Sequence, residues 1–317
     1  MFRAIIRLAV LASACMLFTA ASQGADSGAT SAQSQIAARS QTITVGRVSS
    51  DTVKTAKRLQ ALAKYLAEKL KPMGISEGKA VVARSNEEMI SMLQRGEVDI
   101  VSESVFSALQ FADEGGARPI LREWKKGVAS YHTILLTRKG SGLRSLNDLR
   151  GKVIAFEDPG STSAFYIPLA MLRQAGLETV EVKHGQKPPP GKVGYIFTNG
   201  EVNVAAWVSK GLADAGAISN LDWDDIGRTP NTLKATLEIF DTSPPVLRSV
   251  LLVRGDMPDD LRRAVSDVMT RMHEDPEGKE VLKTYYKVKK YDAISGTVAQ
   301  DLEGIRRLVP LLQDVMM

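Results

Sequence analysis

The sequence predicts an α/β protein with two lobes. Hydrophobic patterns alternate between strand and helix over residues 43–101, and this βαβαβ order favours a mostly parallel sheet with flanking helices. Two similar strands, at 134–137 and 250–253, each run into a basic turn and flank the central part of the chain. The length of 317 residues also suits two domains. We therefore expect two strands to connect a first lobe, residues 42–135 and 246–317, with a second lobe, residues 136–245.

Each element of the first lobe follows from a local pattern. Strands are predicted at 43–48, 81–83 and 98–101. A helix is predicted at 52–70, because apolar residues recur with helical spacing at Val53, Ala56, Leu59, Ala63, Leu66 and Leu70. A capping-box pattern at 85–88 opens a second helix, and Gly96 stands where that helix is expected to have ended.

The rest of the chain continues the alternation. Strands are predicted at 133–137, 152–156, 180–182, 213–218, 237–240 and 250–253. Helical segments are predicted at 146–151, 169–175 and 205–208, after Asp256, after Pro276 and at 295–312. Pro168 is expected either to kink its helix or to begin a second helical segment.

The N-terminus has the composition of a secretory signal peptide. In residues 1–25, two arginines precede an apolar run, and small residues follow it. The run is too short for a good membrane span. Residues 26–41 are small and polar, which predicts a flexible lead-in. Cleavage of the signal removes Cys15, the one cysteine of the sequence, so we expect an exported protein without disulfide or thiol chemistry.

Charge and motifs argue against several function classes. The chain carries 41 basic and 36 acidic residues, a net charge of +5, and its basic residues are scattered, which argues against nucleic acid as a partner. The three histidines, His132, His184 and His273, lack the spacing of metal ligands. The sequence contains no nucleophile elbow and no phosphate-binding loop motif. We therefore expect no catalytic residue, no metal and no cofactor.

The most informative segment is a turn that delivers three hydroxyl residues to the start of a helix. The strand at 152–156 runs into Pro159 and Gly160, and Ser161, Thr162 and Ser163 follow. The first turn of a helix has unpaired N–H groups and partial positive charge, so together with these hydroxyls it can hold an oxyanion. Alternatively, Ser161 only caps the helix. The residues alone leave both interpretations open.

Other polar residues follow predicted strands, and the carboxyl ends of parallel strands form the binding edge of an α/β sheet. Ser49 and Ser50 follow the first strand, where they supply either ligand donors or a helix cap. Ser102, Glu103 and Ser104 follow the third strand at the same edge. From the second lobe we add two candidates, Asn199 and the carboxylate of Asp222.

The chain resembles the periplasmic solute-binding proteins of phosphate, phosphite and phosphonate ABC transporters, the PhnD-like proteins. The resemblance covers about residues 42–290. It rests on Tyr65–Leu70, on Gly96–Asp99, on the Leu-Asn-Asp-Leu-Arg-Gly-Lys segment 146–152, on Asp158–Ser163, and on Ser243-Pro244-Pro245.

The resemblance implies a type II periplasmic-binding-protein fold, in which each lobe is a mixed sheet flanked by helices and two hinge strands join the lobes. It implies that Ser161, Thr162 and Ser163 bind a small oxyanion in the cleft. It further implies a periplasmic monomer that delivers the ligand to ABC permease subunits and meets the membrane only through them. A periplasmic sensor that presents its ligand to a membrane signalling protein is the alternative.

The chain departs from the family pattern at two places. Glu103 and Phe106 stand where members often carry a Gly/Pro and Tyr-containing segment, and residues 198–203 lack a histidine that many members have. A cleft carboxylate at Glu103 would repel bare phosphate but suit a ligand with an ammonium group, such as an aminoalkylphosphonate. Alternatively, Glu103 points to solvent.

Overall fold

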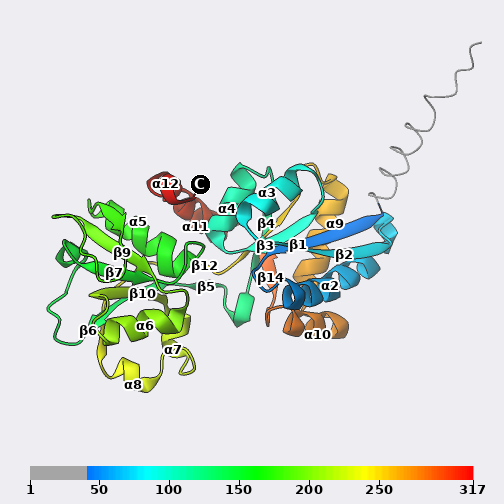
Figure 1. Ribbon diagram of the computed structural model, residues 1–317. Helices are drawn as coiled ribbons and strands as arrows, with labels where there is room; N and C mark the ends of the chain where they lie inside the picture. The colour runs from blue at the N-terminus through cyan, green and yellow to red at the C-terminus, as the bar shows by residue number, and fades with distance from the viewer. Residues whose placement is uncertain (1–40, 317) are drawn as a thin grey trace, which may run out of the picture. The chain divides into compact units, whose positions relative to one another are not determined.

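Two six-stranded sheets, each covered by helices, make up the part of the chain that the computed structural model describes, residues 41–316 (Figure 1). The predicted signal peptide, and all but the last residue of the predicted lead-in, lie outside the described residues. The mixed α/β fold expected from the sequence is confirmed.

The first sheet has the order β14-β4-β13-β3-β1-β2. Its strands are β14 (Tyr291–Ala293), β4 (Arg118–Glu123), β13 (Val250–Val253), β3 (Ile100–Glu103), β1 (Thr42–Val48) and β2 (Glu77–Ala83). β1 pairs in parallel with both β2 and β3, whereas β13 runs antiparallel to β3 and to β4. The strands β1, β3 and β4 therefore end at the same edge of the sheet.

Helices cover both faces of this sheet. They are α2 (Thr52–Lys69), α3 (Asn86–Gln94), α4 (Val105–Asp113), α9 (Asp259–Arg271) and α10 (Pro276–Thr284), with the short turns η1 (Lys71–Met73) and η2 (Lys125–Gly127). Leu59, Ala63, Leu66 and Leu70 are buried as their spacing predicts, but Val53 is 69% exposed. Thr55 points inward in this first turn instead, because its hydroxyl bonds to Ser49.

The second sheet has the order β11-β6-β10-β7-β9-β8. Its strands are β11 (Leu237–Thr242), β6 (Thr133–Arg138), β10 (Ala215–Ser219), β7 (Val153–Phe156), β9 (Val193–Phe197) and β8 (Thr179–Glu181). The helical elements around it are η3 (Leu146–Leu149), the π-helix η4 (Thr162–Tyr166), α5 (Ile167–Gln174), α6 (Glu201–Ser209), α7 (Asn220–Asp224) and α8 (Asn231–Lys234).

The connections between the two sheets are the paired strands β5 (Ser130–Tyr131) and β12 (Val246–Leu247). The sequence predicted the crossings in the longer strands that follow them, at 134–137 and 250–253. However, β6 pairs with β10 and β11 along its length, so it belongs wholly to the second sheet, and β13 belongs wholly to the first. The boundary between the lobes therefore lies before Thr133, and the predicted boundary at residue 135 falls inside a strand.

The C-terminal segment contacts both lobes. It comprises α11 (Gly296–Arg306), η5 (Val309–Leu311) and α12 (Gln313–Met316). Arg306 pairs with Asp113 of α4, and the Asp314 carboxylate accepts a 2.9 Å bond from Arg173 of α5. A hydrophobic cluster joins the same parts, because Phe106, Phe165 and Leu312 belong to it together.

Among residues 41–316, no helix combines the length and the apolar character needed to cross a membrane. The same residues contain no cluster of His, Cys, Asp and Glu side chains that could hold a metal ion.

Candidate ligand-binding site

A cavity of about 310 Å³ lies where the carboxyl ends of strands from both sheets meet. The first lobe contributes Val48, Asn86, Glu103, Ser104 and Ser107. The segments beside the crossings contribute Lys125, Lys126, Tyr131 and Arg248. The second lobe contributes Glu157, Asp158, Gly160, Ser161, Thr162, Ser163, Glu201, Ser219, Leu221 and Asp222.

The hydroxyl turn after β7 forms one wall of the cavity. Ser161 is the helix cap, since its Oγ accepts a 3.2 Å bond from the Ala164 N–H. The first turn is wider than an α-turn: the Tyr166 N–H donates to the Ser161 carbonyl at 3.0 Å, five residues back. Pro168 explains this geometry, because it has no N–H to donate to the carbonyl of Ala164. Pro168 thus begins a second segment, α5, one of the two outcomes expected from the sequence.

Thr162 carries a buried hydroxyl that has no hydrogen-bond partner among the described residues. Its side chain is 2% exposed, it lines the cavity, and its Oγ1 has no hydrogen-bond partner among the described residues. An unpaired buried hydroxyl costs about 1–3 kcal/mol, so such groups are rare without a reason. The turn is held in place from behind, where the Thr133 hydroxyl donates a 2.7 Å bond to the Ser163 carbonyl.

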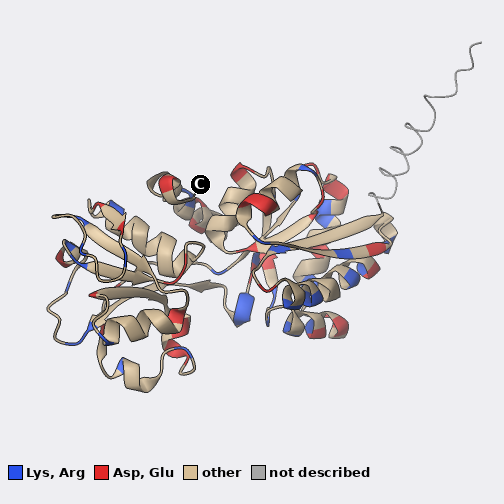
Figure 2. Cartoon of the chain, viewed as in Figure 1, with Lys and Arg blue, Asp and Glu red and all other residues tan. Residues whose placement is uncertain are grey.

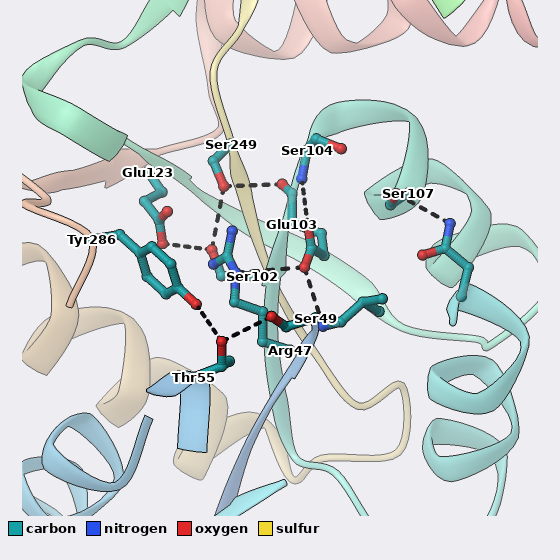
Figure 3. Close-up of polar contacts among 12 residues, drawn as sticks. Arg47, Ser49, Thr55, Ser102, Glu103, Ser104, Ser107, Glu123, Ser249 and Tyr286 are labelled. Carbon is teal, nitrogen blue, oxygen red and sulfur yellow. Dashed lines mark hydrogen bonds and ion pairs between the residues drawn. The ribbon is translucent and has the colours of Figure 1, made fainter. Parts of the chain in front are cut away.

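Glu103 lines the opposite wall, but its charge is already matched within the first lobe (Figure 3). One carboxylate oxygen accepts from the Val48 N–H at 3.2 Å and lies 3.6 Å from the Arg47 guanidinium. The other oxygen accepts from the Ser104 N–H at 3.1 Å. Glu103 therefore occupies the backbone donors at the ends of β1 and β3, and it is 9% exposed rather than solvated.

A buried polar network supports this wall from behind (Figure 3). The Ser102 hydroxyl donates a 2.5 Å bond to Glu123, which is 0% exposed, and Tyr291 donates to the same oxygen at 3.1 Å. The Ser249 hydroxyl donates to the Glu103 carbonyl at 3.0 Å. These bonds fix the ends of β3, β4 and β13 in place.

Three cationic side chains, Lys125, Lys126 and Arg248, line the cavity beside the crossings. The turn η2 carries both lysines, with Lys126 in the left-handed region at φ 53°, and the Lys126 N–H bonds to the Tyr286 carbonyl. Burial, followed by the like charges of Arg47 and Arg248, lowers the pKa of Lys125 to about 7. The Arg248 guanidinium lies 4.5 Å from the centre of the Tyr131 ring, and its Nε is buried without a partner among residues 41–316.

Carboxylates dominate the second-lobe wall. Figure 2 shows acidic residues at the start of α6 and on α7, and a basic η2. Glu157, Asp158, Glu201 and Asp222 all line the cavity, while Arg228 pairs with Glu201 at 2.7 Å and with Asp222 at 3.5 Å. Burial, followed by the charge of neighbouring carboxylates, raises the pKa of Glu157 to about 8. Burial also raises the pKa of Asp158 and of Asp222.

The structure brings most of the predicted site residues together. Ser161, Thr162, Ser163, Glu103, Ser104 and Asp222 all line the cavity. Asp222 is 8% exposed, and its carboxylate accepts a bond from the Ser219 hydroxyl.

Ser49, Ser50, Ser102 and Asn199 are not among the lining residues. The Ser49 hydroxyl bonds within the first turn of α2, and Ser50 is exposed. Ser102 points to the opposite face of β3 from Glu103, as strand alternation requires, and is committed to Glu123. Asn199 lies in a left-handed turn at φ 55° with its side chain exposed.

Several lining residues had no role in the site expected from sequence. The cations of η2 follow β4, a strand that was not predicted because Pro119 and charged residues hide its pattern. Glu157 follows the parallel strand β7, and Glu201 is the first residue of α6. A position at the end of a parallel strand, or at the start of a helix beside one, is the signal that points to these residues.

The comparisons with known proteins agree with this geometry. A family model described as the periplasmic substrate-binding protein of phosphonate ABC transporters matches residues 45–297. Among solved structures, XAC2383 from Xanthomonas citri, bound to chloride ion, is 30% identical with a TM-score of 0.80, covering 87% of this chain and 99% of its own. A second structure of that protein is bound to ATP, with 30% identity, a TM-score of 0.79, and coverage of 87% and 98%.

A more distant solved structure shares the fold. PhnD1 from Prochlorococcus marinus, in complex with methylphosphonate, is 20% identical with a TM-score of 0.61, covering 86% of this chain and 98% of its own. The family match places the protein in the periplasm and gives it a small-molecule ligand and permease partners. The chain belongs to the family of periplasmic substrate-binding proteins of phosphonate ABC transporters.

Proposed function

We propose that the cleft captures a small organic phosphonate through its oxyanion and that the protein delivers it, as a monomer, to an ABC permease. The observation that carries this proposal is the buried Thr162 hydroxyl, which lines the cavity without a partner among the described residues. A phosphonate oxygen would accept a charge-assisted hydrogen bond from it. The neighbouring Ser163 and the cations Lys125 and Arg248 would complete the oxyanion's surroundings.

The charges of the cavity favour an organic phosphonate with an ammonium group over bare phosphate. On the second-lobe wall, Asp158, Glu201 and Asp222 line the cavity, and the Arg228 guanidinium pairs with the last two of them. A dianion without a cationic group would be repelled by this wall, whereas an ammonium group would be attracted to it. An aminoalkylphosphonate carries both charges at opposite ends.

The relatives support an anionic ligand without fixing its size. XAC2383, at 30% identity, has been solved with chloride and with ATP, two anions of very different dimensions. The cavity of about 310 Å³ suits a small ligand. The family supports import, and the sensor alternative is not favoured. We further propose that the protein has no catalytic activity and that a cleaved signal peptide exports it.

The proposed mechanism is closure of the lobes on the ligand. Thr162 of the second lobe supplies one donor. Arg248 supplies another from the segment between β12 and β13, which leads into the first sheet, so one ligand would contact both lobes. A ligand that binds the closed arrangement better shifts the population toward it, and bending at β5 and β12 would accommodate the change.

Isothermal calorimetry tests the ligand assignment. We expect 2-aminoethylphosphonate to bind more tightly than methylphosphonate, and both to bind more tightly than phosphate, phosphite or sulfate. ATP belongs in the same panel because of the relative that binds it. Binding of phosphate ahead of every phosphonate would contradict the role given to the carboxylates, and no response to any phosphorus oxyanion would refute the proposed function.

A further inference from the structure

The Tyr286 ring lies outside the ligand cavity and touches three cationic side chains from three elements of the first lobe. The Arg47 guanidinium, near the end of β1, lies 4.3 Å from the ring centre, and that of Arg58 in α2 lies 4.8 Å from it. The Lys125 ammonium of η2 lies 5.3 Å from the same centre. Of these residues, Lys125 is the one that lines the cavity. Because the face of an aromatic ring attracts cations, Tyr286 supports all three.

The ring holds Lys125 without cancelling its charge. Arg47 has a counter-charge in Glu103, whose carboxylate lies 3.6 Å away. No carboxylate within residues 41–316 lies at ion-pair distance from Arg58 or Lys125. A carboxylate partner would fix the lysine and neutralise it, whereas an aromatic ring carries no net charge. The Lys125 ammonium is therefore supported from one side and remains available to an anion in the cavity.

The backbone of this region is held in an unfavourable conformation. Four residues other than glycine have a left-handed φ between residues 41 and 316, and three of them, Lys126, Tyr286 and Lys287, meet here. The Lys126 N–H donates a 3.2 Å bond to the Tyr286 carbonyl, and the Lys289 N–H donates a 3.0 Å bond to the Trp124 carbonyl. Such residues persist only where their surroundings fix them, and they cluster at ligand sites. The segment 286–289 therefore fixes the turn η2 that carries Lys125.

The ring itself is anchored at its outer end (Figure 3). The Tyr286 hydroxyl lies 3.2 Å from the Thr55 hydroxyl, which in turn donates a 2.9 Å bond to Ser49. Thr55 belongs to the first turn of α2 and is 2% exposed. The ring thus has a fixed orientation toward the cations around it.

We propose that Tyr286 is a positioning residue of the ligand site: it holds η2 and the Lys125 ammonium so that a bound oxyanion meets an already ordered cation. The inference rests on the proposed function, which takes Lys125 as one of the cations around the oxyanion. A free lysine loses rotamer freedom when it binds an anion. A ring that already restrains the ammonium lowers this cost, so the site binds its ligand more tightly.

The first experiment measures methylphosphonate affinity by calorimetry. We expect Tyr286→Leu to weaken binding about 3- to 30-fold, the range of one cation–π contact. Leucine is apolar and not β-branched, so it tolerates the left-handed backbone as well as tyrosine does. Tyr286→Phe keeps the ring and should bind like wild type, although it melts earlier because the contact with Thr55 is lost.

A double-mutant cycle tells positioning from a general effect on the fold. In the Lys125→Met background, Tyr286→Leu should change the affinity by less than about twofold, because the side chain through which it acts is gone. Tyr65→Leu is the matched control. The Lys69 ammonium lies 5.2 Å from the Tyr65 ring, and neither residue lines the cavity, so the affinity should stay within about twofold of wild type.

A second series keeps the shape of the ring and therefore the fold. Phenylalanines with one, two and three fluorine atoms replace Tyr286 in otherwise wild-type protein and in Lys125→Met. Fluorine withdraws negative charge from the ring face and changes the size of the ring little. The affinity should fall stepwise with each fluorine when Lys125 is present and stay constant when it is absent. This series decides the question even if Tyr286→Leu does not fold.

The outcomes separate the positioning role from the proposed function. Equal losses in both backgrounds, no trend with fluorine, or tighter binding by Tyr286→Leu would overturn the role of Tyr286 and leave the proposed function standing. Full affinity in Lys125→Met would do the same. No binding of any phosphorus oxyanion by wild-type protein would overturn both.

Discussion

Ser161 and Thr162 are neighbours with the same functional group, yet the structure gives them different tasks. The Ser161 oxygen accepts a bond from the Ala164 N–H, so it caps the helix. The Thr162 hydroxyl is buried against the cavity and has no partner within residues 41–316. The alternative of a plain helix cap thus applies to Ser161, and the binding hypothesis rests on Thr162.

Replacing Thr162 by valine should separate affinity from stability. Valine keeps the shape and removes the donor, so we expect phosphonate affinity to fall about 10- to 100-fold, the effect of losing about 1.5–3 kcal/mol from one hydrogen bond to a charged group. Because no internal bond is lost, the melting temperature should stay the same or rise. Titration calorimetry and thermal unfolding measure the two quantities.

Ser161→Ala is the matched control for that variant. Loss of a helix cap lowers the free energy of unfolding by about 1 kcal/mol, so this variant should melt earlier than wild type. Unchanged affinity in Thr162→Val would show that the turn serves only to cap the helix.

Glu103 illustrates how a predicted ligand residue acquires a structural role. Its carboxylate faces Arg47, which is 3% exposed, and accepts two backbone N–H bonds at the ends of β1 and β3. Removing it leaves a buried guanidinium without its nearest counter-charge. Its loss therefore affects the fold before it affects any ligand.

Glu103→Ala should lower the free energy of unfolding by about 3–5 kcal/mol, the usual cost of breaking a buried ion pair by removing one partner. Denaturant unfolding measures this change. Glu68→Ala is the control, because Glu68 pairs with Lys71 on the exposed surface at 2.6 Å and its loss should change stability by less than about 1 kcal/mol. Equal effects of the two substitutions would contradict the structural role of Glu103.

At the scale of elements, the sequence predicted those with a clear period and missed those without one. The helix expected at 52–70 is α2, because its apolar residues lie on one face. By contrast α4 was not predicted: its residues 105–111 are buried on every side, so no polar face marks its period. The strand β4 was hidden by its proline and charges, and with it the cations of η2 went unnoticed.

The candidate site was only partly predictable for a similar reason. Ser161, Thr162 and Ser163 stand together in the chain, so a local pattern reveals them. The meeting of Glu157, Glu201 and Arg248 at one cavity depends on the register of strands far apart in sequence. Local composition carries no information on such contacts.

The wide first turn η4 gives Pro168 a testable role. Pro168→Ala restores an N–H that can bond to the Ala164 carbonyl, which now accepts from the Glu157 N–H at 3.4 Å. We expect the turn to tighten toward α-helical geometry and to move the Thr162 hydroxyl, so that phosphonate affinity falls at least tenfold. The stability should change by no more than about 1 kcal/mol, because losing the proline only adds freedom to the unfolded chain.

Calorimetry and thermal unfolding of Pro168→Ala check both parts of this prediction. Pro276→Ala is a suitable control, since Pro276 also stands at the start of a helix but not at the cavity. Full affinity in Pro168→Ala would show that the wide turn has no part in binding.

At the scale of the whole molecule, the lobes share a core even though their sheets are separate. Phe106 of α4 and Tyr166 of η4 pack with ring centres 5.1 Å apart, and one hydrophobic cluster includes both. The C-terminal segment adds ion pairs to α4 through Arg306 and to α5 through Arg173. Each lobe therefore loses buried contacts when the other unfolds.

We expect residues 41–316 to unfold in one cooperative transition, with equal calorimetric and van't Hoff enthalpies in differential scanning calorimetry. Arg173→Ala combined with Arg306→Ala should lower the melting temperature by a few degrees, at about 2–4 °C per kcal/mol, and retain the single transition because the apolar cluster persists. A saturating phosphonate should raise the melting temperature of the whole transition, since a ligand held by both lobes stabilises both. Two transitions, with only one of them shifted by ligand, would mean that the lobes fold independently and that the ligand engages one of them alone.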